Sequence, residues 1–117
     1  MINSTLDLNG ALRNIDNDMD LFRELVEAYI SDTPTVLQHL RSALDQSDLQ
    51  KALIKAHSLK GTTRTIGGVV LGNMAAAMEQ LLCSGDLKRS SELMAGVEME
   101  FKNLVSALQS CICVQVK

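Results

Sequence analysis

Four long stretches of this chain repeat aliphatic residues every three or four positions, which is the spacing of one face of an α-helix. They cover residues 19–43, 49–66, 71–82 and 87–112, and a shorter pattern of the same kind covers Asp7–Arg13. One proline and seven glycines leave little turn material for an all-β fold. Short turns between long amphipathic helices place consecutive helices in antiparallel order. We therefore predict an all-α protein, an antiparallel up-down four-helix bundle with a short extra N-terminal helix.

Three local signals refine the boundaries of these helices. Pro34 lies inside the first long stretch, but the apolar pattern keeps its phase on both sides, so we expect one kinked helix or two nearly collinear ones. Ser47 and Gln50 have the spacing of a capping box that would open the next helix. That helix should end at the Gly67-Gly68 pair, because glycine readily takes a positive φ.

Composition limits the classes of protein to which this chain can belong. Its 117 residues suit a single domain over residues 1–117, with a core at about 8–110. The net charge of −3 argues against nucleic-acid binding and against a polybasic membrane anchor. The sequence has no apolar run long enough to span a membrane and no N-terminal signal pattern. We expect a cytoplasmic protein without membrane contact, and a monomer, because the apolar faces can all meet inside one bundle.

The sequence offers little for a metal, a cofactor or a nucleotide. Cys83, Cys111 and Cys113 are odd in number and lack C-x-x-C spacing, so we expect free thiols with a structural or incidental role. No Glu-x-x-His pair suggests a di-iron bundle site, and no glycine-rich loop or Walker pattern suggests nucleotide binding. We therefore predict no cofactor and no autonomous kinase activity.

The second long stretch contains the segment Ala56–Gly61, which reads Ala-His-Ser-Leu-Lys-Gly. On a helix, His57 lies at the edge of the apolar face, with Lys60 and Gly61 one turn further and Arg64 two turns further. A glycine inside a helix costs about 1 kcal/mol relative to alanine, so Gly61 suggests a purpose other than helix stability. An imidazole beside a glycine gap, with two cations on the same ridge, is a suitable place to hold a phosphoryl group.

This segment resembles the histidine phosphotransfer (HPt) domain of bacterial multistep phosphorelays. The motif continues with Gly67 ten residues after the histidine, and then with Gly68, Leu71 and Glu79. The similarity in helix lengths and order extends from about Leu8 to Leu108. The resemblance implies a phosphocarrier rather than an enzyme.

The resemblance also implies roles for individual residues and partners. His57 would accept a phosphoryl group and exchange it with the aspartate of a response-regulator receiver domain, which would supply Mg²⁺ and acid-base help. Lys60 and Arg64 would offset the phosphate charge. The family often has a small residue at the position of Arg64, so the resemblance supports Lys60 more strongly. Gly61 would leave room for the partner's loops, and a histidine kinase or hybrid sensor kinase would act upstream.

The sequence also suggests which residues could form a partner-docking surface. The candidates are apolar residues near the histidine: Leu53, Ile54 and, on the preceding helix, Phe22 with its neighbour Leu25.

One alternative function is a receiver-binding interaction module that carries no phosphate. Another is the kinase-substrate domain of a chemotaxis-type histidine kinase, phosphorylated by a neighbouring ATP-binding domain.

Overall fold

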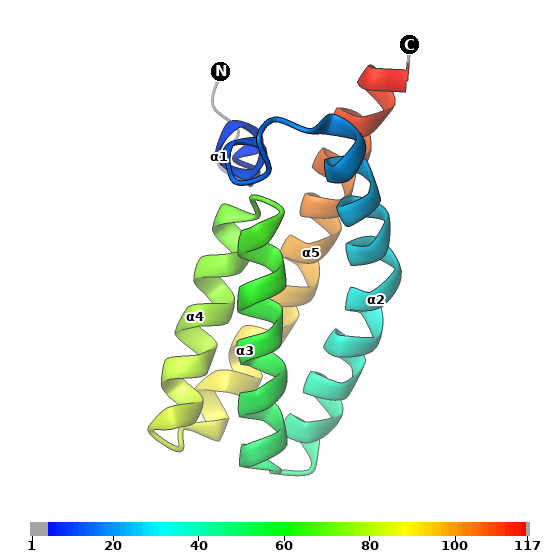
Figure 1. Ribbon diagram of the computed structural model, residues 1–117. Coiled ribbons are helices and arrows are strands. Elements are labelled where there is room, and N and C mark those ends of the chain that lie inside the picture. Colours follow the sequence, from blue (N-terminus) through cyan, green and yellow to red (C-terminus); the bar gives the residue numbers. More distant parts are fainter. Residues whose placement is uncertain (1–4, 117) are drawn as a thin grey trace.

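The computed structural model describes the backbone of residues 5–116 and the side chains of residues 5–112. Four helices run up and down beside one another, and a short helix lies across one end of this bundle (Figure 1). In chain order they are α1 (Leu8–Arg13), α2 (Met19–Asp45), α3 (Leu49–Thr65), α4 (Val69–Cys83) and α5 (Leu87–Val116). The predicted all-α bundle with an extra N-terminal helix is confirmed.

Aspartate side chains define where α1, α2 and α3 begin. Asp7, Asp18 and Asp48 each accept a hydrogen bond from the backbone N–H three residues later. The predicted capping box of Ser47 and Gln50 is therefore wrong by one residue. Ser47 has a φ of 54°, which lets the chain turn sharply after α2 and leaves the cap position to Asp48.

Pro34 does not divide α2, which is one helix of 27 residues. The proline lies on the exposed side of the helix, so its ring does not disturb the packing of the core. Of the two arrangements predicted from the sequence, a single helix is the one observed.

The core is aliphatic and contains methionine, with Phe22, Leu59, Met78, Met94 and Leu104 among its fully buried side chains. A buried hydrogen bond of 2.7 Å between the hydroxyls of Tyr29 and Thr63 ties α2 to α3. Burial raises the pKa of Tyr29 to about 12, although hydrogen bonds with Thr63 and Thr33 act in the opposite direction. These contacts fix the position of α3 within the bundle.

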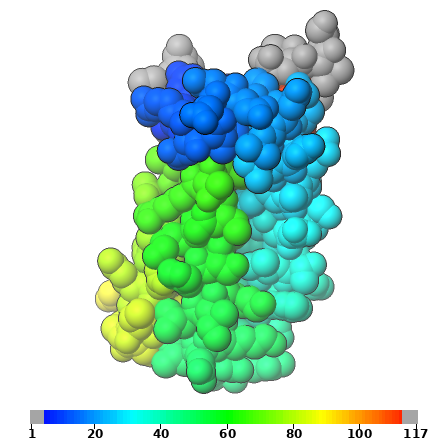
Figure 2. All heavy atoms as spheres, in the orientation of Figure 1, coloured from blue at the N-terminus to red at the C-terminus, as the bar shows by residue number. Residues whose placement is uncertain are grey.

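The turn from α3 to α4 meets the start of α1. Helix α3 ends before Gly67, which has a φ of +87°, as predicted for this glycine pair. The Asp7 N–H donates a hydrogen bond of 2.7 Å to the Gly67 carbonyl, and Leu6 forms an isolated β-bridge with Gly68. Figure 2 shows α1 and the first turns of α2 covering this end of the molecule.

Two other expectations concern membranes and thiols. Among the residues that the model describes, no helix combines the length and apolarity needed to cross a membrane. Cys83 and Cys111 are free, and burial raises the pKa of the Cys111 thiol. Cys113 lies outside the residues whose side chains are described.

Candidate functional site

His57 projects from the middle of α3 with its side chain 68% exposed. The residues around it explain this position. Ala56 and Leu59 are 0% and 1% exposed, so they fix which face of α3 points into the core. His57 follows Ala56 by one position, which turns its side chain about 100° away from the core face. The imidazole is therefore held on a rigid helix but open to the outside.

Glu79 of α4 connects His57 to Lys60. One carboxylate oxygen of Glu79, Oε2, lies 2.5 Å from Nδ1 of His57, and the other, Oε1, accepts a hydrogen bond of 2.5 Å from the Lys60 ammonium. A carboxylate can only accept hydrogen bonds, so Nδ1 of His57 carries the hydrogen. Nε2 has no hydrogen-bond partner within the described part of the chain. When the ring is neutral, its free lone pair is therefore on Nε2.

The electrostatics of this cluster keep Glu79 charged. The hydrogen bond from Lys60, and next the hydrogen bond from His57, lower the pKa of the Glu79 carboxyl below its ordinary value. The Glu79 side chain is 19% exposed, so water screens these interactions only in part. His57, Lys60 and Glu79 thus form one connected group, which we call the histidine cluster.

Gly61 leaves an open space one helical turn from His57. A Cβ atom added at Gly61 would meet nothing within 4 Å, and the residue is exposed. Its φ is not positive, so the backbone does not require glycine at this position. The space above α3 at Gly61 is therefore free for another molecule, as the sequence-based prediction requires.

Arg64 is not part of the histidine cluster. No ion pair or hydrogen bond joins its side chain to His57, Lys60 or Glu79. It passes over Gly72 of α4 instead, where an added Cβ would lie 3.0 Å from the Arg64 Cγ. The structure thus brings together only one of the two predicted cations, and a phosphate contact by Arg64 stays a prediction.

The predicted docking residues have different environments. Ile54 is 58% exposed and lies one turn before His57, whereas Leu53 is partly buried against the core. Phe22 is 1% exposed, so its prediction as a docking residue is wrong. Helical periodicity identifies residues that share a face, but the packing of the other helices decides which face is buried. The neighbouring residue Leu25 lines a groove of about 220 Å³ between α2 and α3.

Glu79 is the residue to which sequence reasoning gave no role, although it belongs to the family pattern. A signal was present in the sequence. Glu79 directly follows the core residue Met78, just as His57 directly follows the core residue Ala56. On two antiparallel neighbouring helices, these positions can meet along the shared groove. Within the described residues, no group of three or more His, Cys, Asp or Glu side chains could hold a metal ion.

Comparisons with known proteins identify the family and the fold. The family model of the Hpt domain matches residues 24–111. The crystal structure of histidine-containing phosphotransfer protein B (HptB) from Pseudomonas aeruginosa PAO1 is similar with a TM-score of 0.85 and 25% identity, covering 93% of this chain and 95% of that one. The HPT domain of a sensor hybrid histidine kinase from Shewanella shares the fold, with a TM-score of 0.79, 19% identity and coverage of 94% and 95%. A comparison with curated protein sequences gives no match.

Proposed function

The chain belongs to the Hpt domain family of histidine phosphotransfer domains, and we propose that His57 is the residue that carries the phosphoryl group. Hpt domains are phosphocarriers in phosphorelays rather than enzymes. The observation that carries this assignment is the exposed imidazole of His57, whose Nδ1 is held by Glu79 and whose Nε2 has no partner among the described residues. The other histidine, His39, has no hydrogen bond or ion pair with a described residue.

The transfer step follows from this arrangement. The lone pair on Nε2 attacks the phosphorus of the partner's phosphoaspartate, and the bond from phosphorus to the aspartate oxygen breaks, which returns the aspartate as a carboxylate. The imidazole ring gains positive charge as the bond from Nε2 to phosphorus forms. Glu79 stabilises that charge through the hydrogen on Nδ1, and it stays ionised because its pKa is lowered. The same step in reverse passes the group to another aspartate.

Lys60 is the cation best placed to act on the phosphoryl group. It lies one turn from His57 and is held within the histidine cluster by Glu79. Its ammonium has three donor hydrogens, so it can keep its bond to Glu79 and still reach a phosphoryl oxygen. Lys60 would thereby offset the negative charge that arrives with the phosphoryl group.

The partner would dock over the open side of α3. Gly61 leaves space for its active-site loops, and Ile54 offers an exposed apolar contact on the same ridge. The groove beside Leu25 extends this surface towards α2. We assign this surface to the receiver domain of a response regulator, and a histidine kinase or hybrid sensor kinase would charge the relay upstream. Mg²⁺ bound to the receiver would supply charge stabilisation, so this chain would need no cofactor of its own.

The proposal includes four further properties of the chain. It would act as a single domain over residues 1–117, as a monomer, in the cytoplasm and without kinase activity of its own. The apolar faces of the amphipathic helices meet in one aliphatic core, which supports the monomer. The absence of a nucleotide-binding motif from the sequence supports the lack of kinase activity.

Phosphotransfer from a labelled partner tests this function. A receiver domain carrying ³²P on its aspartate is mixed with the wild-type protein and with His57→Gln. His57→Gln should keep its fold, because the side chain is exposed and outside the core. We expect label on the wild type alone, and the label should be lost in acid and survive base.

Three other outcomes would contradict the proposal. Label on His57→Gln would mean that another residue carries the group. Binding of receivers without any transfer would favour the interaction module. Label that arrives only from an ATP-binding kinase domain, and never from a receiver, would favour a chemotaxis-type kinase substrate.

A further inference from the structure

The groove of about 220 Å³ between α2 and α3 adjoins the open side of α3. Thr62, which lines it, directly follows Gly61, and Thr65 lies about one turn further along the helix. The two helices lie side by side on the face of the molecule that Figure 2 shows. Aliphatic and aromatic side chains form most of the lining, namely Leu25, Ala28, Tyr29, Val36 and Ile66. A partner that covers Gly61 can therefore extend into an apolar groove.

The hydroxyl groups in this lining already have partners within the protein. Thr62 and Thr65 each donate a hydrogen bond of 3.0 Å to a backbone carbonyl one turn earlier in α3. The hydroxyls of Tyr29 and Thr33 belong to the buried hydrogen bonds that also include Thr63. Because Thr62 and Thr65 are exposed, their methyl groups are available for apolar contact. The groove thus offers apolar surface in spite of its threonines.

Asp32 is the exception in this lining. It is the only charged residue there, and its side chain forms no ion pair or hydrogen bond with another described residue. The residue is exposed, so water solvates its carboxylate in the free protein. A partner seated in the groove removes part of that water, which costs free energy unless the partner supplies a cation. The groove therefore favours a partner surface that combines apolar side chains with a lysine or an arginine.

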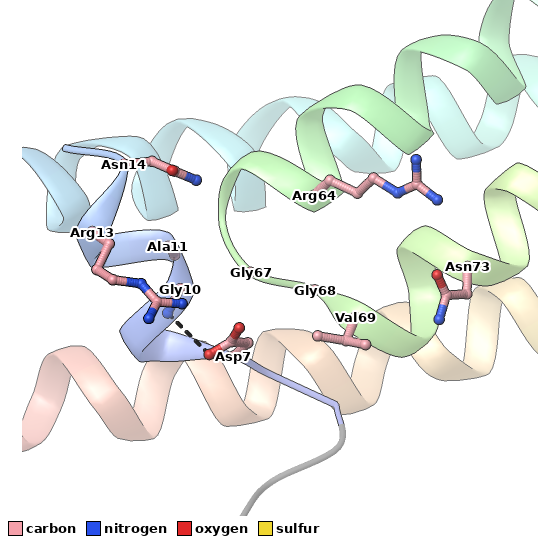
Figure 3. A pocket seen from close by; sticks show the side chains of 10 residues that line it. All are labelled: Asp7, Gly10, Ala11, Arg13, Asn14, Arg64, Gly67, Gly68, Val69 and Asn73. Atoms are coloured by element: carbon pink, nitrogen blue, oxygen red, sulfur yellow. Dashed lines mark hydrogen bonds between the residues drawn. The ribbon is translucent and has the colours of Figure 1, made fainter.

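The hollow at the end of the bundle has a different character. It lies between α1 and the turn from α3 to α4, and Figure 3 shows the polar side chains that extend around it. These are Asp7, Arg13, Asn14, Arg64 and Asn73. A partner over Gly61 thus finds apolar lining on the α2 side of α3, in the groove that contains Asp32.

We propose that Asp32 is a specificity-determining residue for the receiver domain, which places a lysine or arginine flanked by apolar side chains over this groove. The inference rests on the proposed function, because it assigns the groove to the partner that exchanges the phosphoryl group with His57. Charges at such an interface act mainly on the choice of partner and on the rate of association. A receiver with a neutral or acidic residue opposite Asp32 would bind more weakly.

Binding to a receiver without transfer tests the proposal. The background is His57→Gln, which removes the proposed acceptor, and the probe is the unphosphorylated receiver domain of the ³²P assay. We expect ¹H–¹⁵N NMR shifts on binding in residues 25–36 and 61–66. Calorimetry should show that Asp32→Asn weakens binding about tenfold and Asp32→Lys about a hundredfold.

Glu27→Gln is the matched control, since it removes one negative charge from the same helix. Glu27 is exposed, forms no ion pair with a described residue and lies about 140° around α2 from Asp32. Its replacement should change the affinity for the receiver by less than about twofold. Asp32 is exposed and outside the core, so its variants should keep the circular dichroism spectrum of the wild type.

The cation on the receiver is located by replacing its surface lysines and arginines one at a time with glutamine. One replacement should weaken binding to the protein with Asp32 but cause almost no further loss with Asp32→Asn, as expected for a direct pair. Absence of binding, an equal effect of Asp32→Asn and Glu27→Gln, or the lack of any coupled cation would overturn the proposal. Binding that depends on Asp32, without transfer of label to the wild type, would support this inference and contradict the proposed function alone.

Discussion

At the scale of single residues, substitutions of Gly61 can distinguish its effect on helix stability from its effect on access of the partner to His57. The backbone there is helical and an added Cβ meets nothing within 4 Å, so Gly61→Ala should raise the free energy of unfolding by about 0.5–1 kcal/mol. Gly61→Gln places a larger side chain one turn from His57. It should slow phosphotransfer from a receiver about tenfold or more, because it occupies the space that the partner needs. Urea denaturation and the transfer assay measure the two effects.

Gly96→Ala on α5 is the control for the effect of removing a helical glycine. Its Cβ would lie 3.2 Å from the Met74 Cε, the flexible end of a side chain, and Gly96 is remote in sequence from His57. Transfer by Gly96→Ala should stay at the wild-type rate. If Gly61→Gln also transfers at that rate, Gly61 has no role in partner access.

At the scale of helices, the histidine cluster is a link between α3 and α4 that depends on pH. The pKa of Glu79 is lowered in the folded protein from an ordinary value of 4.5, so its stabilising contribution is fully present above that value. As the pH falls through the lowered pKa, the carboxylate gains a proton and the contribution is lost. Glu79→Gln should therefore reduce the free energy of unfolding at neutral pH by up to about 1 kcal/mol, and the difference should shrink in acid.

Urea denaturation at about pH 7 and about pH 3 measures this difference. Glu92→Gln on α5 serves as the control, because Glu92 forms no ion pair with a described residue. Its effect should be small at both values. A Glu79→Gln difference that stays constant or grows in acid would mean that the carboxylate does not stabilise this helix pair.

The positions of the helices could be predicted from the sequence, but contacts between them could not. Periodicity identified every helix, because amphipathic repeats reflect burial along one face. Periodicity did not show that the face carrying Phe22 is covered by other helices. The capping-box spacing was wrong at Ser47, because a left-handed turn there moves the cap to Asp48. The bond from Glu79 to His57 spans 22 residues, and only packing of α4 against α3 brings these side chains together.

At the scale of the whole molecule, the bundle acts as a rigid support for one exposed imidazole. The core residues of four helices fix α3, α3 fixes the ring of His57, and Glu79 from α4 fixes its tautomer. The motif around His57 was sufficient to propose this residue as the acceptor, because its spacing on a helix is local. The ring nitrogen that is free to react could not be predicted, since it depends on a hydrogen bond from another helix.

NMR can test directly whether Nε2 of His57 accepts the phosphoryl group. The protein is labelled with ¹⁵N in its histidine rings, phosphorylated by a receiver and examined for coupling between phosphorus and each ring nitrogen. We predict a bond from phosphorus to Nε2 of His57, with Nδ1 still carrying its hydrogen towards Glu79. A bond from phosphorus to Nδ1, or phosphorus on any other residue, would contradict the assignment of Nε2 as the acceptor atom.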